Sequence, residues 1–382
     1  MNKRGFIDSA QAIVQNEAVL IDGSIAPLGF VNLSMAGEVT LMNIELLKRL
    51  SETPGVAGRE ERVREILAAE AEPLFDEIRV DCMGNLIANR KAAVAGAPRV
   101  LIACHMDEIG FYVKHIDDKG YARLAAAGGF DPRTLLARRV LVCTRDGDLE
   151  GLLNPTGRPI HIAKDEEKKK IPEIDDLFID FCLPADQVKQ KVRIGDPVSL
   201  VQPFGRIGSC YTGKCLDNRV GGFVLLEAMK KVTNPRFEVV FVATVQEEVG
   251  LRGAGPAAYA CEPQIAIALD TTLCVDLPGV PEDERVTRQG DGVAIKVMDS
   301  GTISDRGLVD ELVELGHKRD IPCQLSILPR GGTDAAAMQR SRGGVRAISL
   351  AVPTRYIHTV TECIHERDLA SAIDLLAAWL DG

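Results

Sequence analysis

The sequence predicts an α/β protein in which a mixed sheet carries helices on both faces and a small β-rich domain is inserted into the chain. Several short runs are apolar throughout, as strands are when helices cover both sides of a sheet. These runs are residues 99–104, 239–244, 265–269 and 347–352. Amphipathic helical segments lie between or after them, at residues 218–232, 307–317 and 366–380. This alternation favours an α/β sheet that is at least partly parallel.

The chain begins with weak periodicity, so residues 1–40 are predicted to be an extension before the first firm element. Met35 and Met42 leave open where translation starts. A helical pattern runs from Met42 to a turn at residues 51–55, and a second helix is predicted over residues 60–74. Both helices precede the first buried strand.

The middle of the chain has short β-type runs separated by Gly and Asp turns. These runs are residues 140–143, 151–153, 177–181 and 197–201. They predict a β-rich barrel or sandwich inserted at residues 109–202. The α/β domain then consists of residues 41–108 and 203–382.

Composition and charge narrow the class of protein and its partners. With 382 residues and a formal charge of -10, the chain is long enough for a full core and is acidic. An acidic chain does not attract phosphate backbones or anionic headgroups, which argues against nucleic-acid and membrane partners. A secretory signal needs a continuous apolar segment near the N-terminus, and here polar residues interrupt that segment. The ten cysteines include no C-x-x-C pair, as is typical of thiols in a reducing compartment. The chain is therefore predicted to be cytoplasmic.

Histidines and acidic residues follow several of the predicted strands. They are His105 and Asp107 after 99–104, Glu247 and Glu248 after 239–244, Asp270 after 265–269, and His358 after 347–352. Asp217 adds a carboxylate before the helix at 218–232, where a helix cap is the alternative role. Ligands collect beyond the carboxyl ends of the strands in an open α/β sheet, so these side chains could meet in one crevice.

The adjacent pair Glu247 and Glu248 is hard to explain structurally, because buried carboxylates without partners are costly. A pair of divalent cations removes that cost and supplies a function, since two metals polarise a carbonyl and acidify a bound water. A ligand set with two histidines suits zinc or cobalt, or manganese, better than magnesium. The residues therefore predict a two-metal hydrolase.

Five stretches of the chain resemble those of the tetrahedral aminopeptidase family. These stretches are residues 105–111, 214–219, 246–254, 331–335 and 353–359. The family consists of cytosolic two-metal exopeptidases with glutamyl, leucyl, lysyl and deblocking members, and some relatives are named endoglucanase or cellulase M. The resemblance implies a zinc-exopeptidase-like sheet, an inserted barrel that serves as the dimerisation domain, and dimers that assemble into a dodecamer.

The same resemblance implies the metal ligands. Asp217 would bridge two divalent ions, His105 and Asp270 would complete one site, and Glu248 and His358 the other. The resemblance also implies a cis peptide bond between residues 217 and 218.

Two further residues receive roles in the expected reaction, the removal of N-terminal amino acids from short peptides. Glu247 would be the general base that takes a proton from the attacking water and delivers it to the leaving amine. Asp107 would accept a hydrogen bond from the far ring nitrogen of His105 and so fix its tautomer.

Other functions stay open at this point. An N-acyl amino acid deacylase would use the same metals, a β-glucanase would normally use two carboxylates without a metal, and a non-catalytic oligomeric scaffold would use none of these ligands. The preferred first residue of the substrate is also open. Arg330 and Arg355 could favour an acidic side chain, or each could pair with a structural carboxylate.

Overall fold

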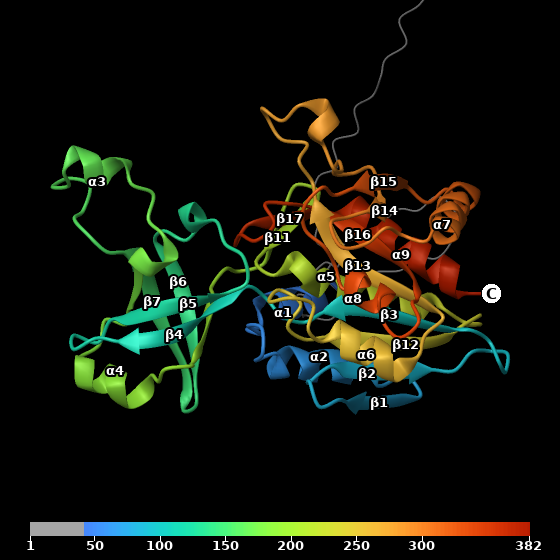
Figure 1. The fold of residues 1–382 in the computed structure, drawn as a ribbon, viewed down its shortest axis with the longest axis horizontal. Helices are drawn as coiled ribbons and strands as arrows, with labels where there is room; N and C mark the ends of the chain where they lie inside the picture. Colours follow the sequence, from blue (N-terminus) through green and yellow to red (C-terminus); the bar gives the residue numbers. More distant parts are fainter. Residues whose placement is uncertain (1–41) are drawn as a thin grey trace, which may run out of the picture. The chain divides into compact units, whose positions relative to one another are not determined.

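The computed structural model describes residues 42–382, and Asn43–Gly382 form one compact unit (Figure 1). The predicted extension at residues 1–40 and the question of the translation start lie outside the described residues. None of the described helices is long and apolar enough to cross a membrane.

Within residues 42–382, eleven strands form one mixed sheet. The strands are β1 (Glu77–Val80), β2 (Leu86–Arg90), β3 (Arg99–His105), β10 (Gly205–Ile207), β11 (Cys210–Gly213), β12 (Glu238–Thr244), β13 (Ile265–Leu273), β14 (Val293–Met298), β15 (Cys323–Ile327), β16 (Arg346–Arg355) and β17 (Glu362–His365). Their main order is β1-β2-β12-β3-β13-β16-β17-β11-β10, and β14 pairs with both β15 and β16. The predicted mixed sheet is confirmed.

The centre of the sheet is parallel, with β12, β3, β13 and β16 side by side. His105 at the end of β3 pairs in register with Thr244 at the end of β12. Asp270 pairs with Ala351 of β16. The carboxyl ends of all four strands therefore meet at the same edge, which is where an open α/β sheet binds ligands.

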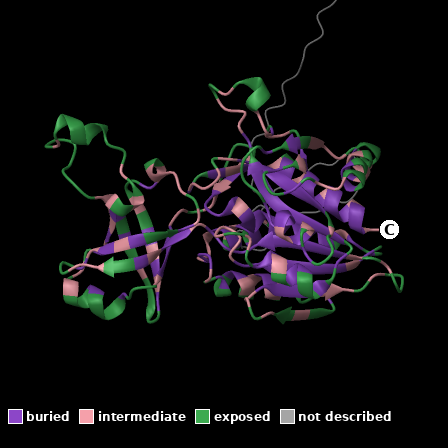
Figure 2. Ribbon diagram, in the orientation of Figure 1, coloured by how far each residue is buried: buried purple, intermediate pink, exposed green. Residues whose placement is uncertain are grey.

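Helices cover both faces of this sheet, as predicted. The described α-helices of this part are α1 (Ile44–Glu52), α2 (Glu61–Ala71), α5 (Leu216–Lys231), α6 (Ala254–Cys261), α7 (Arg306–Arg319), α8 (Ala335–Gln339) and α9 (Glu366–Leu380). On one face Leu101 and Ala103 of β3 pack in a core cluster with residues of α6 and α8. On the other face Cys104 lies directly under Gly221 of α5. Alternate residues of β3 thus enter two separate cores, so the central strands are almost wholly buried (Figure 2).

The inserted segment forms a closed antiparallel barrel with the strand order β4-β5-β8-β7-β6-β9. The strands are β4 (Gly110–Ile116), β5 (Ala122–Ala127), β6 (Arg138–Thr144), β7 (Gly147–Pro155), β8 (Leu177–Asp180) and β9 (Pro197–Leu200). Phe111, Val140 and Val198 belong to its buried core. Two short helices, α3 (Asp165–Lys169) and α4 (Ala185–Lys191), lie in its connections. The prediction of an inserted β-barrel is confirmed.

A buried ion pair lies where the barrel meets the sheet. Glu108 stands just before the first barrel strand, β4, and Lys214 follows the sheet strand β11; the Nζ of Lys214 lies 2.7 Å from a Glu108 carboxylate oxygen. Glu108 also accepts hydrogen bonds from Gly55 and from Ser199 of the barrel. Burial acts to raise the pKa of Glu108, but the charges of Lys214 and Arg219 and the hydrogen bonds from Lys214 and Cys215 together outweigh it, so the pKa is lowered. Glu108 is therefore held as an anion at the junction.

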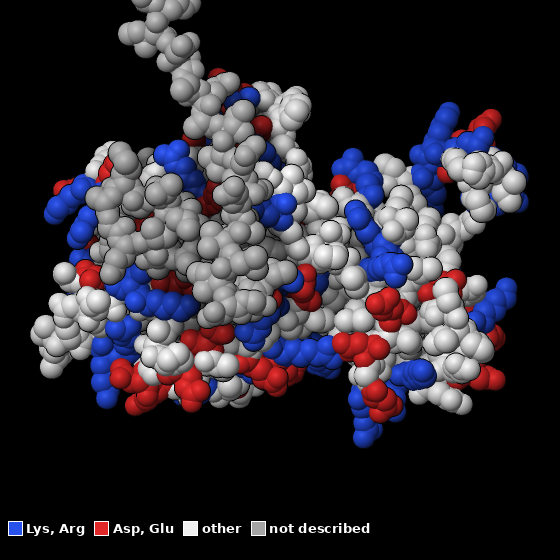
Figure 3. Space-filling view, turned by 180° about the vertical axis from the view of Figure 1, so that it is seen from behind, with Lys and Arg blue, Asp and Glu red and all other residues white. Residues whose placement is uncertain are grey.

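The described surface carries charges of both signs. On the face shown in Figure 3, lysines and arginines are interspersed with aspartates and glutamates. Such mixing is typical of the surface of a soluble domain.

Candidate metal centre

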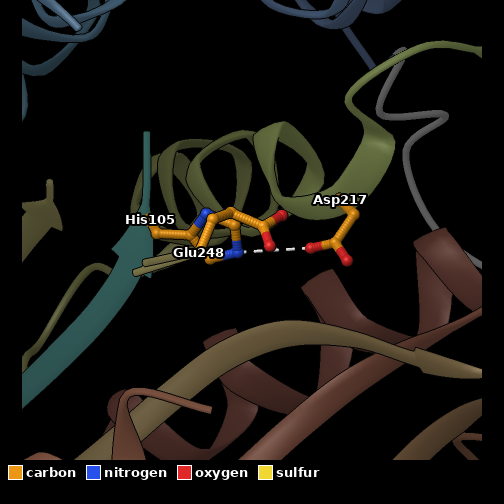
Figure 4. Close-up of side chains that lie close together, drawn as sticks. All are labelled: His105, Asp217 and Glu248. Carbon is orange, nitrogen blue, oxygen red and sulfur yellow. Dashed lines mark hydrogen bonds and ion pairs between the residues drawn. The ribbon is translucent and has the colours of Figure 1, made fainter. Parts of the chain in front are cut away.

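His105 and Asp217 approach each other at the carboxyl edge of the sheet (Figure 4). His105 ends β3, and its Nε2 lies 3.2 Å from Oδ1 of Asp217. Asp217 stands at the start of α5, where the backbone of Asp217 and Asn218 is not helical and the peptide bond between them is cis. The side-chain amide of Asn218 donates a hydrogen bond of 2.7 Å to the main-chain carbonyl of Leu269 in β13. This bond ties the turn to the sheet.

Glu247 and Glu248 lie in the turn that follows β12, and buried carboxylates hold the turn in place. The two oxygens of Asp107 accept hydrogen bonds from the main-chain N–H groups of Glu247 and Glu248, each at 3.0 Å. Glu60, at the start of α2, accepts one from Gln246 at 3.1 Å. Asp107 and Glu60 thus fix the backbone of this turn, and the turn sets the position of the two glutamate side chains.

His358 comes from the loop after β16 and has a backbone φ of 63°. Its Nε2 lies 3.3 Å from Glu248 Oε2 and 3.7 Å from Asp217 Oδ2. The carboxylate of Glu362 in β17 accepts hydrogen bonds from the main-chain N–H groups of both Asp217 and His358, at 2.9 Å each. The sequence reasoning did not single out Glu362, although it lies four residues after His358.

Asp270 completes the arrangement from within β13. It was expected directly after a strand ending at residue 269, but the strand continues to Leu273. Its Oδ1 lies 3.9 Å from Nε2 of His105, and Oε2 of Glu247 lies at the same distance from that nitrogen. Ligand atoms of His105, Asp217 and Glu248 lie within 4.8 Å of one another, as do those of His105, Glu247 and Asp270. The structure therefore brings together every residue that the sequence proposed as a metal ligand or general base.

The second ring nitrogen of His105 contacts Asp107. Nδ1 lies 3.1 Å from the main-chain carbonyl oxygen of Asp107 and 3.5 Å from its carboxylate. Donation of the Nδ1 proton to this residue would leave Nε2 free as a ligand. The shorter contact is to the carbonyl, whereas the expected acceptor was the carboxylate.

The charges of the site fit divalent cations. Burial raises the pKa of Asp270 to about 8 and also raises the pKa values of Glu247 and Glu248. Burial acts to lower the pKa of His358, but the carboxylates of Glu248, Asp217 and Glu362 together outweigh it and raise the pKa to about 9. Within residues 42–382, no lysine or arginine forms an ion pair with Asp217, Glu247, Glu248 or Asp270. Crowded carboxylates and imidazoles of this kind are a donor set for zinc-type ions.

The same residues line a cavity of about 580 Å³. Besides the candidate ligands, the lining includes the apolar residues Leu273, Leu328 and Ile357. It also includes Lys296 and Arg330. Arg355 does not contribute a free charge, because its guanidinium is paired with both oxygens of Asp276 at 2.6 and 2.7 Å. The cavity is large enough to take an amino acid side chain next to the metal ligands.

Comparison with known proteins gives consistent similarities. The model of the M42 glutamyl aminopeptidase family matches residues 84–375. A lysyl aminopeptidase of Pyrococcus furiosus is 33% identical over 351 residues, covering 89% of this chain and 97% of that protein. An aminopeptidase structure from the archaeon Desulfurococcus kamchatkensis has a TM-score of 0.84 and 37% identity, covering 88% of this chain and 94% of the other. The structure of the Pyrococcus horikoshii TET1 peptidase, which can assemble into a tetrahedron or a large octahedral shell, matches with a TM-score of 0.79 and 33% identity. The match covers 88% of this chain and 99% of that one.

Proposed function

We propose that this chain, which belongs to the M42 glutamyl aminopeptidase family, removes N-terminal amino acids from peptides by hydrolysis that depends on two divalent metal ions. The observation that carries the proposal is the convergence of His105, Asp217, Glu248, Asp270 and His358 on one edge of the sheet. Zinc, cobalt or manganese would suit these ligands.

The five proposed ligands would be divided between the two ions. Asp217 would be shared between them, since its two carboxylate oxygens face His105 and His358 respectively. His105 and Asp270 would complete one site, and Glu248 and His358 the other. Bound there, the ions would polarise the scissile carbonyl and acidify the attacking water.

Glu247 is proposed as the general base. Its carboxylate would take the proton of the water on Oε and later deliver it to the amine of the leaving peptide. Burial raises the pKa of Glu247, as is needed for a carboxylate that accepts a proton near neutral pH. Asp107 and Glu362 would act as positioning residues, because they hold the backbone of Glu247, Asp217 and His358 rather than the reacting atoms.

We also propose that the barrel joins chains into dimers and that the dimers build a dodecamer. The proposal is supported by the assembly of the Pyrococcus horikoshii relative into a closed shell. A shell of this kind would restrict the substrate to unfolded peptides.

The substitution Glu247→Gln tests the proposed chemistry. The variant should bind the same amount of zinc or cobalt as the parent protein, because Glu247 is not among the proposed ligands. Its turnover of aminoacyl p-nitroanilides should fall by about 10²- to 10⁴-fold, the usual contribution of a general base. Metal content is measured by mass spectrometry and turnover by absorbance.

Glu61→Gln, at an exposed glutamate of α2, is the matched control and should keep full activity. Retained activity in a metal-loaded Glu247→Gln protein would refute the assigned role.

A second experiment separates an aminopeptidase from a deacylase by comparing free and N-acetylated forms of one peptide in the same assay. Only the free form should be cleaved.

A further inference from the structure

Two cysteines that are far apart in the sequence lie next to each other on β11 and β17. Cys210 of β11 pairs in register with His365 of β17. Cys363, two residues before His365, pairs with Thr212. Alternate residues of a strand face the same side, so the two cysteines are diagonal neighbours on one face of the sheet. Both thiols are free and partly exposed.

The side chain of Gln289 contacts both thiols. The Sγ of Cys210 donates to Oε1 of Gln289 at 3.7 Å, and Nε2 of Gln289 donates to the Sγ of Cys363 at 3.8 Å. The same Nε2 donates to the main-chain carbonyl of Cys363 at 2.6 Å, which fixes the amide. Burial raises the pKa of Cys210 to about 11, and the neighbouring thiol of Cys363 adds to this rise. The two thiols are therefore close enough to interact.

Cys363 directly follows a residue that supports the candidate metal centre. The carboxylate of Glu362 accepts hydrogen bonds from the main-chain N–H groups of Asp217 and His358, at 2.9 Å each. The position of β17 thus affects the backbone of two proposed ligands. The proposed mechanism itself uses neither cysteine.

We propose that Cys210 and Cys363 form a reversible disulfide bond, with a low-molecular-weight disulfide as the oxidant, and that this bond weakens metal binding. The thiolate of one cysteine attacks the small disulfide, bonds to one of its sulfurs and releases the other as a thiol. The second cysteine then attacks the mixed disulfide, forms the Sγ–Sγ bond and releases the remaining thiol. The two cysteines are oxidised, the small disulfide is reduced to two thiols, and the two cysteine protons end on these thiols.

Formation of the bond would move β17. Diagonal neighbours across two strands stand roughly 7–8 Å apart, whereas a disulfide needs Cα atoms about 4.4–6.8 Å apart. The bond would therefore draw Cys363 toward β11, and Glu362 would move with it. Disturbed support of metal ligands typically lowers metal affinity about 10- to 100-fold. This effect rests on the proposed metal centre, whereas the disulfide bond itself does not.

The test treats the full-length protein with oxidised glutathione. Digestion without reduction, followed by mass spectrometry, should yield a peptide pair joined through Cys210 and Cys363 that dithiothreitol separates. Calorimetric titration with zinc should give a Kd about 10- to 100-fold larger for the oxidised protein than for the reduced one. Reduction and removal of the reductant should restore the original Kd.

Serine variants identify the thiols that are responsible. Cys210→Ser and Cys363→Ser should each bind zinc as the reduced parent does, and oxidised glutathione should not change their Kd. Cys82→Ser, at an exposed cysteine between β1 and β2, is the matched control and should still lose affinity on oxidation. If a serine variant folds poorly, the measurements on the parent protein decide.

The outcomes separate this inference from the proposed function. Mapping that finds only mixed disulfides with glutathione, or no bond between Cys210 and Cys363, overturns the inference. A bond that forms without changing the zinc Kd overturns its link to the metal centre. If the reduced protein binds no zinc, the proposed function fails, while the joined peptides still support a thiol pair that can be oxidised.

Discussion

At the scale of single residues, the candidate centre depends on acidic side chains that support other acidic side chains. Asp107 uses both carboxylate oxygens on the backbone of Glu247 and Glu248. Glu362 does the same for Asp217 and His358. Main-chain N–H groups are good partners for buried carboxylates because they supply hydrogen bonds without a competing positive charge. These hydrogen bonds do not neutralise the carboxylates, so the centre keeps the net negative charge that would attract divalent cations.

The pKa shifts of the centre predict how metal binding depends on pH. Burial raises the pKa of Asp270 from 3.8 to about 8. Between these pH values the unfolded chain loses this proton more readily than the folded one, so the metal-free fold becomes less stable as pH rises. Burial acts to lower the pKa of His358, but Glu248, Asp217 and Glu362 together raise it from 6.5 to about 9. The stabilisation from protonated His358 is complete below pH 6.5 and is lost as pH rises through 9. Both effects weaken the metal-free protein between pH 6.5 and 8, whereas a bound dication replaces the protons.

The difference in melting temperature between zinc-loaded and chelator-treated protein should therefore be larger at pH 8 than at pH 6. Differential scanning calorimetry at the two pH values measures this difference. Equal differences at both values would contradict a centre whose ligands must lose protons to bind metal.

The sequence was sufficient to propose His105, Asp217, Glu247, Glu248, Asp270 and His358 because each stands at or near the end of a recognisable buried strand or the start of a helix. Glu362 and Glu60 were not predicted. Both act through main-chain N–H groups of distant segments, and the sequence contains no spacing that reports such contacts.

At the scale of elements, α5 lies so close to the sheet that its glycines set the position of Asp217. A Cβ atom on Gly221 would lie 2.6 Å from Asn218 Oδ1, 2.7 Å from the carbonyl oxygen of Leu269 and 2.8 Å from Cβ of Cys104. Two of these neighbours are sheet atoms that cannot move easily. The third is the residue that follows Asp217.

Gly221→Ala should therefore lower the free energy of unfolding by about 1–3 kcal/mol, the usual cost of overpacking, and should also weaken metal binding. Gly255→Ala in α6 is the matched control, because the nearest atom to its added Cβ would be 4.0 Å away. That variant should be neutral or more stable by up to about 1 kcal/mol. Urea unfolding and zinc titration measure both effects, and equal stability of the two variants would show that α5 can shift away from the sheet.

The central elements could be predicted because their apolar runs are long and buried on both faces. The same reasoning did not detect β1, whose residues are mostly exposed, or the partly exposed edge strand β15. It also did not detect α6 and α8, which are short and rich in alanine, so that no apolar stripe distinguishes them. The strand pairing order and the closure of the barrel follow from contacts between distant residues, which a single sequence does not specify.

At the scale of the whole molecule, the barrel carries apolar side chains that a solitary chain would leave in water. Ile160, Ile162 and Ile171 lie in the connection between β7 and β8 and are 59%, 70% and 59% exposed. Large apolar side chains exposed on one connection favour a contact with another chain. This connection is a candidate surface for the proposed assembly.

Light scattering on the purified protein should give a mass about twelve times that of the 41.3 kDa chain. The double substitution Ile160→Glu and Ile162→Glu should reduce this mass, because charge at a buried contact opposes association. Ile207→Glu is the control, since Ile207 is 73% exposed in β10, outside the barrel, and its substitution should leave the mass unchanged. A parent protein with the mass of one chain at all concentrations would exclude the proposed dodecamer.

The ion pair between Glu108 and Lys214 couples the base of the barrel to the turn that carries Asp217. Glu108 stands just before the first barrel strand, whereas Lys214 follows β11 and stands three residues before Asp217. Breaking this buried pair would leave one charge without its partner at a point that both domains share. A disturbance of the barrel can therefore reach the candidate metal centre along the backbone.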